Sequence, residues 1–349
     1  MEDQKRFGIL AAFIAAIFFG AAAPLSKPLL PFLNNYQMAG LLYLGAALGV
    51  SLILIKEKSM QWPWQIRRKE ALKLSGAIIF GGILGPLFLL AGLRIAAASS
   101  VSLWLNLELL ATAVLGHLFF KDYLSKKGWF ASIGALGAAT LLAWEGGIAG
   151  FKAGGLIILA CICWGIDNHL TALIDGITPA QSTFWKGLFA GSFNLAIGLL
   201  MGSFTANVVQ TLGALGLGVV SYGLSILLYI TSAQHLGATR SQLIFSSAPF
   251  FGLFIALLFG EAFTLIQFIA LVTFLISIYV LFKETHSHAH IHQALIHTHM
   301  HTHPNPHHEH EHLDLSETSV RHIHAHEHTY LRHDHPHWPD IHHRHEHSD

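Results

Sequence analysis

The chain has 349 residues, of which 53% are hydrophobic and only 11% are charged, with equal numbers of basic and acidic residues. A soluble domain carries roughly 25% charged residues, so this composition excludes an ordinary soluble globular protein. The mean hydropathy of +0.51 points the same way and indicates a polytopic membrane protein.

Apolar segments recur along the chain at the length that a membrane helix needs, which is about 20 residues. The first follows a short charged start and has no convincing cleavage site, so it is predicted to be a membrane helix and not a signal peptide. Turns rich in glycine, proline and asparagine separate the segments. The predicted spans, about ten in number, are residues 8–26, 36–55, 74–94, 98–118, 128–145, 153–174, 181–201, 208–230, 236–259 and 262–282.

Lysine and arginine are unevenly divided between the two sets of connecting segments. If the N-terminus is cytosolic, the outer segments contain only Lys27, Arg94 and Lys152. The positive-inside rule then predicts a multi-pass protein of the cell membrane, of the inner membrane in a bacterium, with both termini in the cytoplasm. The cytosolic set is Lys5, Arg6, Lys56, Lys58, Arg67, Arg68, Lys69, Lys73, Lys121, Lys126, Lys127, Arg240 and Lys283.

Two short sequence matches divide the chain into halves. Phe19-Gly20 in the first span corresponds to Trp164-Gly165 in the sixth, and residues 119–125 correspond to 258–264. Each half then holds an odd number of spans, so the halves have opposite topology and form an inverted repeat. The predicted units are a first five-helix repeat at 1–145, a second at 152–284, and a tail at 285–349.

These motifs are similar to those of the drug/metabolite transporter superfamily, in its EamA-like permease branch. The resemblance covers about residues 7–283 and includes the acidic-x-x-Ser/Thr pairs Asp122/Ser125 and Glu261/Thr264. It also includes Ser246-Ser247-Ala-Pro249 in the ninth span, where the first half has Leu110 in place of the proline. The resemblance implies a secondary transporter of a small metabolite or drug-like solute that works by alternating access.

An acidic residue lies deep in the fourth span. Trp104, Glu108 and Thr112 are spaced four residues apart, so they share one face of a continuous helix. A carboxylate at that depth suits the transfer of a proton or the binding of a cationic group. The alternative is a structural ion pair with a basic residue of a neighbouring helix.

The sixth span carries three consecutive polar residues, Asp167, Asn168 and His169. Consecutive residues lie about 100° apart around a helix, so the three cannot share one face. Trp164 with Asp167 or Asn168 is the predicted cavity face, and His169 is expected to be a locally satisfied residue. Cys161 and Cys163 point in nearly opposite directions, which favours packing over shared metal binding.

Further candidates lie in the seventh and ninth spans. Lys186 shares an i, i+4 stripe with Ser182, Ala190 and Asn194, and it either lines a cavity or snorkels to the cytosol. Gln242 and Ser246 of the ninth span complete the predicted set of substrate-binding or coupling residues.

The tail has a different composition, because it holds all but three of the 26 histidines. With few apolar residues it cannot build a core, so it is predicted to be disordered without metal. Closely spaced neutral imidazoles bind Zn, Ni, Co or Cu. The predicted metal ligands are His286, His288, His290, His292, His297, His299, His301, His303, His307, His308, His310, His312, His322, His324, His326 and His328.

Three functional classes remain open. The first is a secondary transporter of a small solute with a metal-binding cytosolic tail, and it is not expected to be an enzyme. The second is a divalent transition-metal transporter, for Zn, Ni or Co, and the third is a membrane-anchored metal sensor or buffer. No Gly-x-x-x-x-Gly-Lys-Ser/Thr loop is present, so ATP-driven transport by this chain alone is unsupported. The expected partners are the lipid bilayer, a small-molecule solute, metal ions and a second copy in a homodimer, with no nucleic acid and no cofactor required for transport.

Overall fold

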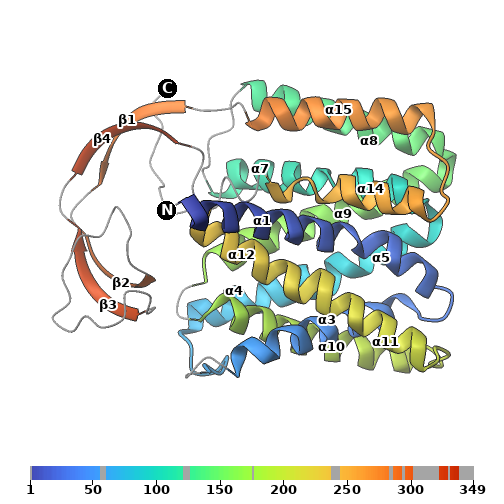
Figure 1. Cartoon of the computed structure of the whole chain (residues 1–349), viewed down its shortest axis with the longest axis horizontal. Coiled ribbons are helices and arrows are strands. Elements are labelled where there is room, and N and C mark those ends of the chain that lie inside the picture. Colours follow the sequence, from blue (N-terminus) through green and yellow to red (C-terminus); the bar gives the residue numbers. More distant parts are fainter. Residues whose placement is uncertain are drawn as a thin grey trace.

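The described residues between 2 and 282 form a bundle of long helices that run along one common direction (Figure 1). The computed structural model describes residues 2–55, 60–120, 126–174, 177–236 and 244–282, with four short segments at 286–292, 295–301, 322–328 and 331–337. The first half contains α1 (Glu2–Gly20), α2 (Ala22–Ser26), the 3-10 helix η1 (Lys27–Leu29), α3 (Asn35–Leu54), α4 (Arg68–Ala77), the π-helix η2 (Ile78–Leu84), α5 (Gly85–Ile95), α6 (Ala98–Trp104), α7 (Leu107–Phe120) and α8 (Lys126–Glu145). The second half contains α9 (Gly147–Ala172), α10 (Pro179–Met201), α11 (Val208–Leu217), the π-helix η3 (Gly218–Leu224), α12 (Ser225–Leu236), α14 (Ala248–Leu258) and α15 (Leu265–Phe282).

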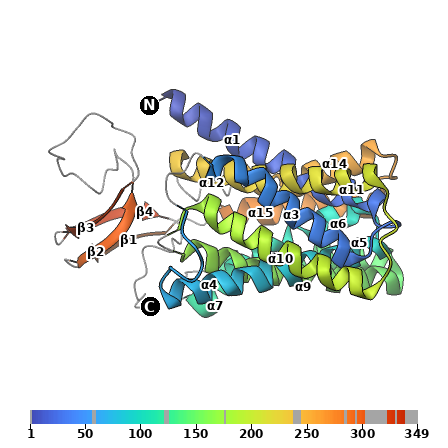
Figure 2. The same cartoon turned by 90° about the horizontal axis from the view of Figure 1, so that it is seen from below.

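Seven of the described helical segments are long and apolar enough to cross a membrane. They are Arg6–Leu29, Asn35–Leu54, Arg68–Ile95, Ala98–Phe119, Gly147–Thr171, Pro179–Met201 and Val208–Ser232. The shorter apolar helices α14 and α15, with the alanine- and glycine-rich α8, occupy the other predicted spans. The predicted all-α membrane fold is therefore confirmed. Figure 2 shows that α1 begins at the end of the bundle where the strands of the tail lie.

Helix packing repeats between the two halves. α3 packs along α10, α6 packs against α14, and α8 packs against α15, so each pair joins a helix to its counterpart. Several other contacts come in matched pairs: α1 packs on α12 as α9 packs on α5, and α14 packs on α1 as α7 packs on α9. A pseudo-two-fold axis in the membrane plane produces this exchange, so the predicted inverted repeat is confirmed.

The central helices α3 and α10 pack along each other in opposite directions, and hydrogen bonds connect them at both ends. Asn34 and Gln37 form a capping box at the start of α3, and the Gln37 amide also donates to the carbonyl of Gly198, 3.1 Å away near the end of α10. At the other end, Gln181 in the first turn of α10 accepts from the backbone N–H of Gln61, 3.3 Å away, after α3. The same residue type therefore ties each helix start to its partner's end.

Two irregularities recur at matching places in the halves. The third span of each half contains a π-helical segment, η2 in one and η3 in the other, at a sequence offset of 140 residues. The fourth span of each half is interrupted, at Leu105–Asn106 between α6 and α7 and at Ser246–Ser247 before α14. Interrupted helices in corresponding positions are the usual builders of transporter binding sites.

The glycines of the two matched dipeptides make equivalent helix crossings. A Cβ atom on Gly20 would overlap the carbonyl oxygen of Ala248 in α14, and one on Gly165 would lie 3.2 Å from the backbone nitrogen of Thr112 in α7. Both glycines therefore let the first helix of a half approach the backbone of an interrupted helix closely. This equivalence supports the correspondence inferred from the sequence.

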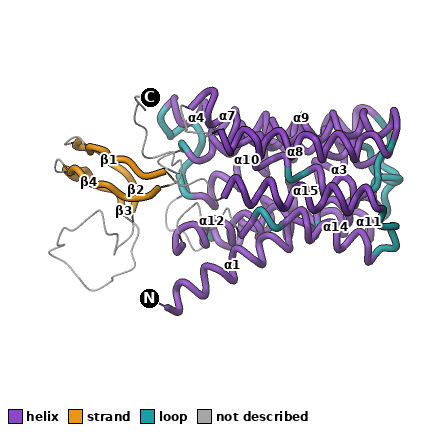
Figure 3. Tube along the Cα trace, turned by 90° about the horizontal axis from the view of Figure 1, so that it is seen from above, coloured by secondary structure: helices purple, strands orange, loops and turns teal. Residues whose placement is uncertain are grey.

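The described segments of the tail are four short strands (Figure 3). β1 (His286–His292) pairs antiparallel with β4 (Leu331–His337), and β2 (Leu295–His301) pairs antiparallel with β3 (His322–His328). The alternation of histidine with other residues has a period of two, which is also the period of a strand. Disorder of the tail in the absence of metal stays a prediction.

Candidate functional site

A small cavity lies where the two interrupted helices meet. It comprises about 370 Å³ of empty space, part of it open to the surroundings, and is lined from both halves. One side carries Leu105, Asn106, Glu108 and Leu109 from α6–α7 and the other carries Phe245, Ser246, Ala248 and Pro249 from the start of α14, with Phe19 and Ile278 completing the wall. Each residue of the first group precedes its counterpart in the second by 140 positions, so Pro249 corresponds to Leu109 and not to Leu110, as the sequence comparison had it. The cavity is therefore built at the axis that relates the repeats.

Glu108 is held in the cavity wall by the sixth span. The amide Nδ2 of Asn168 in α9 donates to Glu108 Oε1 at 3.2 Å and to Thr112 Oγ1 at 3.3 Å. Glu108 lies in the first turn of α7, where the positive end of the helix dipole favours a carboxylate. The structure thus brings together three predicted site residues, Glu108, Thr112 and Asn168, and Ser246 lies across the same cavity.

Asn106 is a site residue that the sequence analysis missed. Its side chain is 5% exposed, and its Nδ2 donates to the carbonyl of Leu103 at 2.8 Å. Because a carbonyl only accepts, this bond fixes which way the amide is turned. The remaining atom, Oδ1, has no hydrogen-bond partner, and the residue lines the cavity.

Aromatic rings surround the central residue Phe19. Its ring centroid lies 5.4 Å from that of Phe245, 6.1 Å from Tyr222 and 6.2 Å from Trp164. The two residues matched in the sequence analysis, Phe19 and Trp164, therefore meet at the centre of the bundle. A second polar cluster lies outside the cavity lining.

The second cluster is an ion pair between Asp167 and Lys186. Lys186 Nζ lies 2.7 Å from both carboxylate oxygens of Asp167, and both residues are 8% exposed. The hydroxyl of Thr171 donates to Asp167 Oδ1 at 2.9 Å. Lys186 therefore neither snorkels to the surface nor faces the cavity of Glu108. The sequence analysis considered an ion pair between Glu108 and a basic residue, but the basic residue Lys186 pairs with Asp167 instead.

The π-helical turn of η2 packs directly against this ion pair. A Cβ atom on Gly81 would overlap the Asp167 carboxylate, so only glycine fits there. The carbonyl of Gly81 accepts from the Tyr43 hydroxyl and from Trp164 Nε1, the latter at 3.2 Å. A π turn displaces carbonyls from the regular helical pattern, and here side chains from two other helices satisfy one of them.

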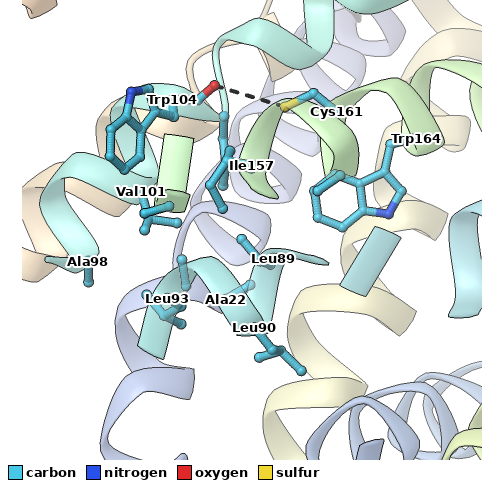
Figure 4. Packing of buried hydrophobic residues seen from close by; sticks show 14 of the residues in the cluster. Ala22, Leu89, Leu90, Leu93, Ala98, Val101, Trp104, Ile157, Cys161 and Trp164 are labelled. Carbon is cyan, nitrogen blue, oxygen red and sulfur yellow. Dashed lines mark hydrogen bonds between the residues drawn. The ribbon is translucent and has the colours of Figure 1, made fainter. Parts of the chain in front are cut away.

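Trp104 lies away from the cavity, contrary to the predicted shared face with Glu108. Its ring is 1% exposed and Nε1 donates to the carbonyl of Ala139 at 3.0 Å. Figure 4 shows Trp104 beside Ile157, with its carbonyl contacted by Cys161. The prediction assumed a continuous helix, whereas the helix is interrupted at Leu105–Asn106, between Trp104 and Glu108.

The remaining predicted residues fall into three groups. His169 Nε2 hydrogen-bonds the Thr112 carbonyl at 2.9 Å, in keeping with a locally satisfied histidine, and both cysteines are buried packing residues. Gln242 and the motif residues Asp122 and Ser125 lie outside the described residues. So do five of the predicted tail ligands, His303, His307, His308, His310 and His312.

Polar contacts tie the helices together at the end of the bundle opposite the start of α1. Glu261 accepts from the backbone N–H groups of Ala98 and Ser99, both at 2.8 Å, and lies 3.6 Å from Lys27 Nζ. Gln267 of α15 donates to the Ser99 hydroxyl at 3.0 Å. Burial raises the pKa of the Glu261 carboxyl, but hydrogen bonds from Ser99 and Ala98 and the charge of Lys27 outweigh it, so the pKa is lowered.

Comparison with known proteins places the chain in a family. The sequence model of the EamA-like transporter family matches twice, over residues 6–144 and 152–283. An uncharacterized transporter of Methanothermobacter thermautotrophicus is 25% identical over 302 residues, which cover 80% of this chain and 87% of that protein. One crystal structure with 13% identity has a TM-score of 0.57 and covers 78% of this chain and 96% of its own, a similarity of fold. The two family matches together span most of the sequence, and the chain therefore belongs to the EamA-like transporter family.

Proposed function

We propose that the protein is a secondary transporter that moves a small organic solute by alternating access, with Glu108 at its binding and coupling site. The observation that carries this proposal is the cavity between two interrupted helices of opposite repeats, with a carboxylate in its wall. Discontinuous helices at a repeat interface supply polar groups at mid-membrane depth without exposing backbone to lipid. This is a transport function and not an enzymatic one.

The contacts suggest how the cycle proceeds. The Lys27–Glu261–Ser99 contacts hold one end of the bundle together, and in the proposed cycle they would close the cavity on that side. Exchange of the matched helix contacts between the halves would open that end and close the other. Glu108 either carries a proton or holds a cationic group during the exchange, with Asn168 steadying one oxygen of the carboxylate.

Replacing Glu108 by glutamine tests the proposal. Glutamine keeps the size but removes the charge, and a hydrogen bond to a charged group contributes about 1.5–3 kcal/mol, so we expect flux to fall by about 10- to 100-fold. The measurement is solute flux into proteoliposomes at matched protein content. Glu145→Gln is the matched control, because Glu145 is exposed at the end of α8. Full flux in Glu108→Gln, with the same abundance and elution profile, would reject the role of this residue.

We propose that both termini are cytoplasmic. The support is the lysine and arginine distribution, together with the positions of the start of α1 and the end of α15 at the same end of the bundle (Figure 1). A single cysteine inserted after Lys283, in a chain whose own two cysteines are replaced by alanine, should resist a membrane-impermeant thiol reagent in intact cells. Labelling from outside would reverse the orientation.

We propose further that the tail binds transition-metal ions and tunes transport without performing it. In the β1–β4 register His286, His288 and His290 lie opposite His337, His335 and His333, and β2–β3 pairs histidines in the same way. This register therefore pairs histidine with histidine at alternate positions along the strands. Neutral imidazole is a ligand for Zn, Ni, Co and Cu.

Removal of the tail gives the corresponding test. We expect the full chain to bind several Ni or Zn ions at neutral pH, and a chain ending at Thr285 to lose that binding while remaining in the membrane with transport activity. Free histidine titrates near pH 6.5, so metal affinity should fall as the pH is lowered from about 7 to 5. Calorimetry on both chains measures binding. A truncated chain that has lost all solute flux would show that the tail is part of the transport machinery.

A further inference from the structure

We infer that the solute is a small organic ammonium ion with at least one N–H group and an apolar body, and that its charged end binds between Glu108 and Asn106. The inference rests on the proposed transport function and adds the chemical class of the solute. It follows from which groups of the cavity wall are already engaged and which remain available.

The negative charge of Glu108 is available to a ligand. Its described polar contact is the neutral amide of Asn168 at 3.2 Å. Lys186, the buried lysine among the described residues, is paired with both carboxylate oxygens of Asp167 at 2.7 Å. A charge in a poorly solvated wall requires a partner of opposite sign. Among the described residues the buried lysine is paired with Asp167, so a cationic ligand can supply the partner of Glu108.

Asn106 adds a requirement for a hydrogen-bond donor. Its Oδ1 is an acceptor without a partner, held in place because Nδ2 is bonded to the Leu103 carbonyl. Asn106 and Glu108 lie two residues apart at the start of α7 and line the same cavity. A ligand N–H between them would satisfy both acceptors, whereas a quaternary ammonium would satisfy only the charge.

The other wall residues determine the rest of the solute. Phe19, Leu105, Leu109, Phe245, Pro249 and Ile278 are apolar, and an aromatic face also attracts a cation. A carboxylate on the solute would be repelled by Glu108, which disfavours anions and zwitterions. An amine on a short apolar or aromatic body has the complementary chemistry.

The two repeats differ at the position of Glu108, so the solute binds in one preferred orientation. Ala248 occupies the place in the second half that Glu108 occupies in the first, and Ser246 corresponds to Asn106. The ammonium group therefore faces α7 and the apolar body faces α14.

The experiment is a binding series with the full chain in detergent. The probes share a phenyl-two-carbon body: 2-phenylethylamine, its N,N,N-trimethyl derivative, 2-phenylethanol and 3-phenylpropionate. We expect the amine to bind at least about tenfold tighter than the alcohol or the carboxylate, as for a hydrogen bond to a charged group. The trimethyl derivative should bind with intermediate affinity.

Two variants assign the preference to the wall. Glu108→Gln should bring the amine and alcohol affinities together, and Asn106→Leu should reduce the preference for the amine over its trimethyl derivative while retaining the preference for charge. Glu145→Gln should behave as the parent chain. If the alcohol or the carboxylate binds the parent chain as tightly as the amine, the inferred solute class is wrong, and this comparison needs no variant to fold.

Flux of the same probes into proteoliposomes separates this inference from the transport proposal. Amine-selective binding without flux of any probe would overturn the transport function and leave the binding chemistry standing. Glu108-dependent flux of the alcohol or carboxylate, without preference for the amine, would overturn the solute class and leave the transport function standing.

Discussion

Replacing Lys186 by methionine should destabilise the folded protein by about 3–5 kcal/mol, because it leaves the buried Asp167 carboxylate without its counter-charge. Both carboxylate oxygens lie 2.7 Å from Lys186 Nζ, and only Thr171 adds a further described hydrogen bond to the carboxylate side chain. Gly81 blocks the Asp167 carboxylate from moving toward η2. The cost therefore cannot be relieved by a small shift.

The measurement is the unfolding free energy, or the thermal loss of the monodisperse peak, in one detergent. The double variant Asp167→Asn/Lys186→Met should recover most of the lost stability, since removing both charges of a buried pair is often close to neutral. Lys152→Met is the control, because Lys152 is exposed in the first turns of α9. Equal losses in Lys186→Met and Lys152→Met would show that the pair contributes no more than a surface lysine.

A second large effect is expected at the crossing of α3 with the third span of the second half. A Cβ atom on Gly218 would overlap the carbonyl oxygen of Leu42, and one on Gly45 would overlap that of Leu215, so these backbones touch from both sides. Gly218→Ala should cost about 1–3 kcal/mol through forced separation of the helices. The overlap is with a backbone oxygen, which cannot rotate away as the end of a side chain can.

Gly216→Ala is the matched control for this crossing. It lies two residues earlier in the neighbouring α11, and a Cβ there would have no neighbour within 4 Å. Alanine stabilises a helix relative to glycine by up to about 1 kcal/mol, so this variant should be neutral or slightly more stable. The measurement is the same unfolding assay, and the idea fails if both alanine variants have the same stability.

The repeat could be predicted from sequence, but the orientation of its central residues could not. Dipeptides such as Trp164-Gly165 mark helix crossings, where the need for glycine leaves a trace in the sequence. Asp167 and Asn168 are only 100° apart on α9, so either fits a cavity face. Contacts with Gly81 and Lys186 on other helices decide the rotation of α9, and a single segment contains no information on them.

The break at Leu105–Asn106 was missed for a related reason. Neither proline nor glycine marks it, and Leu103 to Leu110 is an apolar run around two polar residues. The break depends on the Asn106 side chain, which takes the Leu103 carbonyl, so it is a local polar choice within an apolar pattern. An asparagine two residues before an intramembrane acid was the signal that could have revealed it.

The self-paired contacts α3–α10, α6–α14 and α8–α15 have an energetic consequence for the empty carrier. In a carrier that alternates as proposed, these contacts persist in both end states, and matched contacts such as α1–α12 and α5–α9 exchange. Perfectly identical halves would make the two states equal in free energy, so the resting population reports only differences between the halves. A difference of about 1 kcal/mol, the scale of one polar contact such as Lys27 with Glu261, shifts that population about fivefold. The end state that is more populated in the absence of solute is therefore determined by the few residues that differ between the two halves.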